Sequence, residues 1–258
     1  MDLAAGPVVL LALLAACGRV SFDAVSGDGG THGDDADGDA KPLGPDDYTA
    51  RFPFDTLEVT NMRYPDESGT RFARCPDPLK CGTIGAGVFL GAAYFDGNTE
   101  LRITSEAAFE TPSAYTISVW VKIAPDLVNA CLVSKLVGAA DGNSWQLCET
   151  APDQYLAYAS TTGLTNDHLL STNGSFDVWH HVALRWDGSV VRVTVDGSSD
   201  MDSGDASTAV AFDGQDIVLG FDVDGGVSAN YFTGYLDELR VYNRALSDAD
   251  VAQLATLP

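Results

Sequence analysis

The sequence predicts an all-β protein, an antiparallel sandwich or barrel that ends in a short helix. Three observations support this class. Short apolar runs are separated by glycine, aspartate and asparagine at intervals of about 8–15 residues, as in a series of hairpins. Within the runs, apolar and polar residues alternate with the period of a strand. One segment, at the C-terminal end, combines helical spacing with a helix start signal.

The segment 115–123, YTISVWVKI, is the clearest strand. One face carries Tyr115, Ile117, Val119, Val121 and Ile123, and the other carries Thr116, Ser118, Trp120 and Lys122. The segments 179–186 and 190–196 are joined by Asp187-Gly188-Ser189, which indicates a hairpin. The other predicted strands are 52–55, 88–95, 101–104, 130–135, 144–148, 155–158, 217–221 and 235–242.

The C-terminal helix is predicted to begin after Ser247. Ser247 is a favourable N-cap residue, and Asp250 three positions later completes a box-like pair. Acidic side chains in this first turn also lie at the positive end of the helix dipole. Val251 and Leu254 share one face, which we expect to pack on the sheet.

The chain is strongly acidic. Its 258 residues include 37 Asp and Glu against 14 Lys and Arg, a formal net charge of −23. Nucleic acids are bound largely through Lys and Arg at phosphates, so this charge argues against nucleic acid and against anionic membrane surfaces as partners. It is compatible with bound cations and with uncharged ligands. The length fits one β-rich domain with an extension.

The first residues include an apolar run too short to span a membrane. The run 8–16 is well below the ~20 residues that a transmembrane helix needs, and it ends in small residues, as secretion signals do. Leu14-Ala15-Ala16-Cys17 resembles the lipobox of bacterial lipoproteins, in which the cysteine is lipidated and becomes the mature N-terminus. The absence of Lys or Arg before the run departs from that pattern. The alternative is a buried helix with an ordinary cysteine.

We therefore predict a lipoprotein signal peptide over 1–16 and a lipid on Cys17, with membrane contact through that anchor only. Gly18 after the cysteine implies, by the same resemblance, export to the outer membrane of the cell envelope. Residues 17–47 are rich in Gly and Asp and nearly free of large apolar residues, which predicts a disordered linker. The folded domain is expected over 48–258.

Four cysteines remain once Cys17 is assigned to the lipid. An even number in an exported protein predicts disulfides, and four cysteines allow three pairings. Cys75 and Cys81 flank the short loop PDPLK, whereas Cys131 and Cys148 lie in successive predicted strands. We favour the pairs Cys75–Cys81 and Cys131–Cys148. A four-cysteine zinc site is the alternative, and the chain has no C-x-x-C pair to support it.

Several segments, in chain order, resemble one known family. They are FPFD (52–55), DESG (66–69), AAYFDGNTELRI (92–103), YTISVWVK (115–122), WHHVALRWDG (179–188), VRVTVDG (191–197) and GYLDELRVYNRALSDADV (234–251). Together they resemble the laminin G-like domain of the concanavalin A-like lectin/glucanase superfamily, over about residues 48–256. The resemblance implies a two-sheet antiparallel jelly-roll sandwich. It implies function only loosely, because function depends on sites added to a fold.

Many domains of this family bind calcium, and the resemblance implies a candidate site here. The positions that match the family's pattern are Asp55, Asp66, Ser68 and Asp237. The chemistry is reasonable, because Ca²⁺ prefers six to eight oxygen ligands from carboxylates, hydroxyls and carbonyls. Ca²⁺ is therefore the expected cofactor.

Asp237 and Glu238 are adjacent in a predicted strand, so their side chains are expected on opposite faces. Asp237 then shares the predicted inner face with Tyr235, Leu239 and Val241. One ion could bind both carboxylates only if the strand contained a bulge. The alternative to a metal is that Asp237 accepts backbone N–H bonds or pairs with Arg240 or Arg244.

Enzyme activity is not expected. The β-glucanases of the superfamily carry E-x-D-x-x-E on one strand, and that sequence does not occur here. His180 and His181 are candidates for a general base, but they lie in a predicted strand that the family uses as scaffold. The chain also has no G-x-S-x-G and no H-E-x-x-H motif.

The predicted function is a non-catalytic recognition module at the cell envelope, with carbohydrate as the favoured ligand. Exposed aromatic rings stack on sugars, and the candidates are Trp120, Trp145 and Tyr231, whereas Trp179 and Trp186 fit packing positions. The alternative is a domain that binds a surface protein, or is purely structural, and has no small ligand. The oligomeric state does not follow from the sequence.

Overall fold

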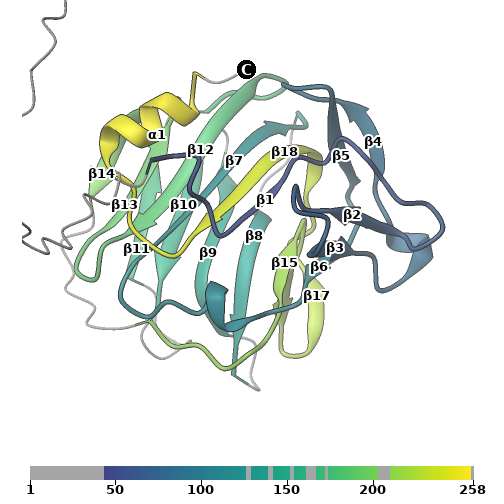
Figure 1. Ribbon diagram of the computed structural model, residues 1–258, viewed down its shortest axis with the longest axis horizontal. Coiled ribbons are helices and arrows are strands. Elements are labelled where there is room, and N and C mark those ends of the chain that lie inside the picture. The colour runs from purple at the N-terminus through teal and green to yellow at the C-terminus, as the bar shows by residue number, and fades with distance from the viewer. Residues whose placement is uncertain are drawn as a thin grey trace, which may run out of the picture. The chain divides into compact units, whose positions relative to one another are not determined.

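The computed structural model describes residues 44–125, 129–138, 142–151, 154–160, 167–171, 174–202 and 210–256. Two eight-stranded sheets, A and B, face each other, and a separate two-stranded hairpin lies beside sheet B (Figure 1). Every strand pair is antiparallel, so the predicted all-β sandwich is confirmed. The predicted signal peptide, Cys17 and the linker up to residue 43 lie outside the described residues.

Sheet A contains the first and last strands of the fold. Its order is β14 (Ser198–Asp202), β13 (Val191–Val195), β12 (Trp179–Trp186), β7 (Tyr115–Ile123), β18 (Thr233–Tyr242), β5 (Gly91–Asp96) and β4 (Thr83–Ala86), with β1 (Ala50–Phe52) also paired to β18. The strand predicted over 115–123 is therefore β7. Its apolar face enters the core, and its partner β12 turns into β13 through the predicted Asp187-Gly188-Ser189 connection.

Sheet B lies behind sheet A in Figure 1. Its order is β11 (Asp167–Ser171), β10 (Gln154–Ala159), β9 (Gly142–Ala151), β8 (Ala130–Val137), β15 (Ile217–Leu219), β6 (Leu101–Ile103), β3 (Phe72–Arg74) and β2 (Arg63–Pro65). The separate hairpin is β16 (Asp222–Asp224) with β17 (Val227–Ala229). Two single-turn 3₁₀ helices, Pro78–Lys80 and Ala107–Phe109, lie in the connections.

The main core fills the space between the sheets. Its largest side chains include Trp145 of β9, Tyr115 of β7 and Trp186 of β12, whose rings lie 5.6–6.0 Å apart in successive pairs. Aromatic rings at such distances contribute more than their buried area alone. Trp186 is thus a packing residue, as predicted.

The C-terminal helix α1 (Asp248–Leu254) covers part of the outer face of sheet A. Ser247 accepts a hydrogen bond from the Asp250 N–H, and the Asp250 side chain accepts from Ser247, so the predicted capping box is confirmed. Val251 and Leu254 pack with Tyr242 of β18 in a second apolar cluster. Among the described residues, no helix is long and apolar enough to cross a membrane.

Both predicted disulfides are present. Cys75–Cys81 closes the turn that contains the first 3₁₀ helix, and Cys131–Cys148 links directly opposite positions of β8 and β9. Disulfides persist in oxidising compartments, so the two bonds agree with a secreted protein.

Candidate functional site

Asp237 and Glu238 lie where β18 changes its neighbour. Residues 233–236 of β18 pair with β5, and residues 239–241 pair with β1. Between these halves the pairing with β7 shifts register from Asp237 to Arg240, and Glu238 has a φ of 54°. The register shift is a β-bulge, and bulges change the face to which the following residues point.

The bulge makes the predicted placement of Asp237 wrong. Leu236 belongs to the core, so its neighbours Tyr235 and Asp237 face outward. After the bulge, Leu239 and Val241 belong to the core. Asp237 therefore shares a face with Tyr235 but not with Leu239 or Val241, because strict alternation holds only as far as the extra residue.

Asp237 is fully buried even though it faces outward, because the loop between β4 and β5 covers it. Its Oδ2 accepts hydrogen bonds from the backbone N–H groups of Val88 (2.8 Å) and Phe89 (3.1 Å). Its Oδ1 has no hydrogen-bond partner in the described part of the chain. Burial raises the pKa of this carboxyl to about 7. Asp237 is thus a polar anchor for the loop, with half of its carboxylate still unsatisfied.

Glu238 binds two arginines rather than backbone N–H groups. Its carboxylate accepts two hydrogen bonds from Arg51 of β1, at 2.7 Å and 2.9 Å, and Arg240 lies 2.8 Å from it. Arg51 and Arg240 are directly opposite each other in the β1–β18 pair, so the carboxylate offsets a like-charge repulsion. The partner of Arg240 is Glu238 and not Asp237. Arg244 instead donates to the carbonyl oxygens of Gly44 and Asp47.

The four residues predicted to bind calcium separate into two pairs. Asp55 accepts a hydrogen bond from the Gly91 N–H at 2.8 Å, and its charge is one cause of the raised Asp237 pKa after burial. Both carboxylates therefore flank the same loop. Asp66 and Ser68 bond each other, and Asp66 also accepts from backbone N–H groups of its own turn.

The loop beside Asp237 offers a group of converging oxygens. A Cβ atom at Gly87 would fall within 3.0 Å of Asp237 Oδ2 and of the carbonyl oxygens of Phe89 and Gly91. With the unpartnered Oδ1, these atoms fit a hard cation that prefers oxygen ligands. Within the described ranges, no group of three or more His, Cys, Asp and Glu side chains is arranged to hold a metal. Backbone carbonyls would have to supply part of the shell.

Trp145 is not an exposed aromatic. Only 1% of it is exposed, and its ring lies 6.0 Å from Tyr115 in the core between the sheets. Trp145 therefore cannot stack on a ligand. Its position follows from the parity of β9, in which Trp145 and Leu147 point inward and Gln146 points outward.

Trp120 lies on sheet A, whereas Tyr231, in the connection before β18, packs beside sheet B, and both are partly buried. Trp120 is on the outer face of sheet A, as predicted, with its ring edge against His181 at 5.4 Å between centroids. Tyr231 stacks on Phe221 beside the β16–β17 hairpin, and its hydroxyl donates to Glu100 at 2.6 Å. The predicted aromatic candidates do not form one site.

A cavity of about 330 Å³ opens beside the Cys131–Cys148 disulfide, on the outer face of sheet B. This volume lies in the range of small-molecule sites. Its lining is mostly polar, and its members are Asn129, Cys131, Gln146, Cys148, Glu149, Thr150, Leu156 and Asn230. No Lys or Arg occurs among these lining residues.

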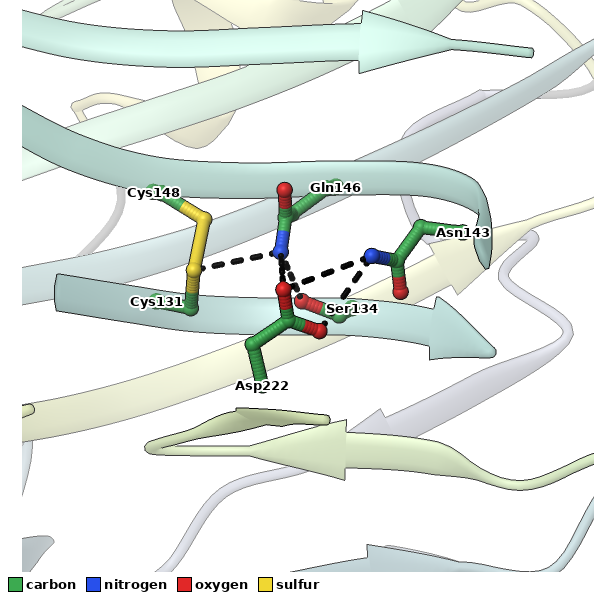
Figure 2. Close-up of a disulfide and its surroundings, with 6 residues drawn as sticks. All are labelled: Cys131, Ser134, Asn143, Gln146, Cys148 and Asp222. Atoms are coloured by element: carbon green, nitrogen blue, oxygen red, sulfur yellow. Dashed lines mark hydrogen bonds between the residues drawn. A yellow bond between two sulfur atoms is a disulfide. The ribbon is translucent and has the colours of Figure 1, made fainter. Parts of the chain in front are cut away.

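Hydrogen bonds hold the floor of this cavity in place (Figure 2). Gln146 Nε2 donates to Asp222 at 2.6 Å, and lies 3.1 Å from Ser134 Oγ and from Cys131 Sγ. Asn143 also donates to Asp222, at 3.2 Å. Figure 2 shows Asp222 pointing from the hairpin strand β16 toward β8 and β9, so the hairpin and the floor are one connected network.

Two asparagines flank the mouth of the cavity. Asn129 has a φ of 56° and Asn230 a φ of 51°, in the left-handed region that asparagine tolerates better than most residues. Both are exposed, and the Asn230 carbonyl accepts a hydrogen bond from the Cys131 N–H at 2.9 Å. Neither asparagine was among the candidates predicted from the sequence. The predicted Cys131–Cys148 pair was the only sequence signal close to them.

Ser175, His180 and Asp196 form a chain of contacts that resembles a hydrolytic triad. Ser175 Oγ lies 2.9 Å from His180 Nε2, and His180 Nδ1 lies 2.7 Å from Asp196 Oδ2. However, the Ser175 backbone N–H also donates to His180 Nε2, at 3.1 Å. That bond occupies the lone pair that a general base would use, so the contacts are better explained as an anchor for the loop before β12. The neighbouring His181 is buried and bonds to Ser118, which fits the predicted scaffold role.

A laminin G-type family model, described as the concanavalin A-like lectin/glucanases superfamily, matches residues 95–252. The chain belongs to this superfamily. The match covers more than half of the 258 residues and confirms the predicted superfamily. No match to this lectin-like chain is found among curated proteins.

Solved structures of similar fold include binding domains of larger proteins. Domain 4 of AbnA, a GH43 extracellular arabinanase from Geobacillus stearothermophilus solved with arabinotriose, has a TM-score of 0.63 and 20% identity, over 81% of this chain and 98% of that one. The botulinum neurotoxin serotype D ligand binding domain, solved with N-acetylneuraminic acid, has a TM-score of 0.60 and 14% identity, over 82% of this chain and 51% of that one. The binding domain of Paraclostridial Mosquitocidal Protein 1 has a TM-score of 0.61 and 14% identity, over 82% and 52%. This lectin-like chain spans about half of each toxin domain, and the likeness is one of fold.

Proposed function

We propose that this lectin-like domain is a non-catalytic carbohydrate-binding module and that the cavity beside Cys131–Cys148 holds the sugar. The cavity is the observation that carries the proposal. It combines a ligand-sized volume with a rigid, hydrogen-bonded floor on a sheet. Side chains on strands hold a binding geometry more tightly than side chains on flexible loops.

The lining has the chemistry that sugar hydroxyls require. The side-chain amides of Asn129 and Asn230 both donate and accept hydrogen bonds, and the Thr150 hydroxyl does the same. Gln146 uses its Nε2 in the floor and can contribute its carbonyl oxygen as an acceptor. Glu149 accepts hydrogen bonds when ionised. Leu156 offers one apolar surface for the C–H groups of a ring. A lining with a carboxylate and without a cation favours an uncharged sugar over an acidic one.

The comparisons support this class of ligand without identifying it. A similar fold in AbnA was solved with arabinotriose, and another in a botulinum neurotoxin with N-acetylneuraminic acid. Those ligands belong to those proteins. For this chain they make saccharides the first class to test.

We further propose that the oxygens around Gly87 bind Ca²⁺, with Asp237 and Asp55 as the carboxylates. The ion would supply positive charge for the unpartnered Asp237 Oδ1 and would fix the β4–β5 loop against β18. Asp66 and Ser68 are not among the proposed ligands, because they form hydrogen bonds within their own turn.

We also propose that Cys17 carries a lipid that anchors the protein at the outer membrane. This proposal is supported by the Leu14-Ala15-Ala16-Cys17 resemblance and agrees with the disulfides, which form outside reducing compartments. Substituting Cys17→Ser should release the protein from the membrane fraction, and continued membrane retention would contradict the anchor.

A glycan array probed with the purified protein tests the binding function. The cavity variant is Asn129→Ala combined with Thr150→Val, which removes hydrogen-bonding groups at accessible positions. A thermal unfolding curve checks that this variant is folded, because alanine is less favourable than asparagine at the φ of 56° of residue 129. The matched control is Asn98→Ala combined with Thr83→Val, which makes the same chemical change at exposed positions away from the cavity. We expect binding to neutral saccharides that the cavity variant loses and the control keeps. Binding to no glycan would favour the alternative, a module for a surface protein.

A further inference from the structure

Three arginines form a cross-strand row at one end of sheet B. Arg63 of β2 is directly opposite Arg74 of β3, and Arg74 is directly opposite Arg102 of β6. Residues that pair in this way point to the same face of a sheet. This face is the outer one, because Ile103, the neighbour of Arg102, belongs to the core.

The row is unexpected for two physical reasons. Like charges at directly opposite positions destabilise a sheet. The chain also carries a net charge of −23, so carboxylates are abundant and could have been placed beside each arginine. A concentration of cations on such a chain indicates a local requirement for positive charge.

The charges of the row are only partly neutralised within the protein. Arg63 forms an ion pair with Glu58 at 2.6 Å. In the described part of the chain, Arg74 and Arg102 form no ion pair within 4.0 Å, although the charge of Glu58 also acts on Arg74 at longer range. Their guanidinium groups lie over aromatic rings instead, Arg74 at 5.0 Å from the Phe72 centroid and Arg102 at 5.1 Å from the Phe221 centroid.

Phe72 is the centre of this surface. Arg63 lies 3.5 Å from its ring centroid, so cations approach the ring from two residues of the row. A second cavity, of about 150 Å³, adjoins Phe72 and Arg74, and hydroxyl groups of Thr70, Thr104 and Ser105 line it. Arg71 also lines it but pairs with Glu106.

We propose that Arg63, Arg74, Arg102 and Phe72 form a second binding surface, for the acidic groups of an anionic polysaccharide. A guanidinium group can donate two parallel hydrogen bonds to a carboxylate or sulfate, which an ammonium group cannot do as well. Phe72 is partly exposed beside these charges and can add an apolar contact to a sugar ring. The nearby hydroxyl groups can bond to sugar hydroxyls.

The partner is a polysaccharide rather than a nucleic acid because the positive surface is small. The row crosses two strand spacings, about 10 Å, and so can contact one or two anionic groups. A chain of closely spaced phosphates would extend onto the acidic remainder of the surface, where it would be repelled. A polysaccharide with an acidic group on every second or third sugar avoids this repulsion, because its other sugars are uncharged.

This surface is separate from the cavity beside Cys131–Cys148. Along the same cross-strand row, Arg102 pairs with Val218, Val218 with Ser134 and Ser134 with Gln146, so two strands stand between Arg102 and the cavity floor. The Phe221 ring also lies against Arg102. Binding at one surface can therefore be lost without loss at the other.

Immobilised hyaluronan and unsulfated chondroitin, which carry one carboxylate per two sugars, and neutral arabinan are the probes, with the full chain as analyte at low and high salt. We expect binding to one or both acidic polymers that weakens with salt, since these contacts are screened. Arg74→Gln combined with Arg102→Gln should lower that affinity at least tenfold. Lys122→Gln combined with Arg192→Gln removes the same charge on sheet A and should change it less than twofold.

The outcomes separate this proposal from the proposed cavity. Acidic-polymer binding that survives in the cavity variant Asn129→Ala/Thr150→Val supports an independent surface, whatever the neutral glycans do. Equal losses of affinity in the two charge variants would show that binding depends only on net charge, which would overturn the proposal. Binding to neither acidic polymer at low salt, or binding to vesicles of phosphatidylglycerol in place of the polymers, would overturn it as well.

Discussion

Arg51 donates two hydrogen bonds to Glu238, and so joins the first strand of the fold to the last. The two N–O distances are 2.7 Å and 2.9 Å, and the Glu238 side chain is only 1% exposed. A bidentate, charge-assisted pair is among the stronger polar contacts in proteins. The bulge in β18 makes it possible, because it lets Glu238 face β1 while Asp237 faces the β4–β5 loop.

Breaking this pair should destabilise the domain. Glu238→Gln leaves Arg51 and Arg240 facing each other without a counter-charge, so we expect a loss of about 3 kcal/mol in the free energy of unfolding. Urea unfolding followed by tryptophan fluorescence measures this loss.

The control for this experiment uses the same arginine. Arg51 also pairs with Glu67, whose side chain is 45% exposed, and exposed pairs contribute under about 1 kcal/mol. Glu67→Gln should therefore have little effect. Similar losses for the two variants would show that the buried geometry of Glu238 has no special role.

His181 should make the domain sensitive to acid. Burial, assisted by the nearby charge of Arg240, lowers the pKa of His181 from 6.5 to about 3. Below pH 6.5, His181 is protonated in the unfolded chain but stays neutral in the folded state. The stability that depends on neutral His181 is therefore fully present above pH 6.5 and is lost as the pH falls toward 3. At pH 4.5 the loss is about 2–3 kcal/mol.

The measurement compares wild type with His181→Gln at pH 7.5 and pH 4.5 by urea unfolding. The variant has no group that titrates at this position. The stability advantage of wild type should therefore shrink by that amount at the lower pH. An advantage that is the same at both pH values would contradict a neutral, buried His181.

The two disulfides should differ in their effects. Cys131–Cys148 closes a longer loop than Cys75–Cys81, with sequence separations of 17 and 6. The chain-entropy model gives roughly 3 kcal/mol for the longer loop and roughly 2 kcal/mol for the shorter. Paired Cys→Ala variants test this by urea unfolding. Only the Cys131/Cys148 variant should also weaken sugar binding, because only that bond lines the cavity. Equal losses of sugar binding in the two variants would show that the Cys131–Cys148 bond has no specific role in the cavity.

Calcium should stabilise the domain through Asp237. We expect a higher melting temperature in 10 mM Ca²⁺ (about tenfold above the weakest Kd of extracellular calcium modules) than in EDTA, since a ligand that binds only the folded state shifts the equilibrium by mass action. Asp237→Asn should remove the shift. Asp66→Asn serves as the comparison, because Asp66 bonds within its own turn, and it should keep the shift. Wild type without any shift would contradict the cation site.

The regular parts of the fold could be predicted from the sequence. Strand β7 alternates without interruption, Ser247 and Asp250 form a local capping signal, and each disulfide joins cysteines that are close in the chain. In all these cases neighbouring residues contain the whole signal. Local patterns of this kind survive folding because tertiary contacts agree with them.

The sites could not be predicted in the same way. Which residues share a face with Asp237 depends on the bulge at Glu238. Glutamate rarely adopts a positive φ, so the residue type at this position does not indicate a bulge. The cavity brings Asn129 and Gln146 next to Asn230, and the arginine row brings Arg63 and Arg74 next to Arg102. These residues come from separate strands and the connections beside them, so their proximity follows from sheet order, which alternation alone does not specify.

The most direct test of the central claim is to locate a bound sugar on the domain. Amide resonances of ¹⁵N-labelled protein can be followed while a saccharide selected from the glycan array is added. We expect the largest shifts to include the side-chain amides of Asn129, Gln146 and Asn230, around the Cys131–Cys148 cavity. Shifts confined to the opposite sheet, around Trp120 and Tyr235, with these amides unchanged, would contradict the proposed cavity site.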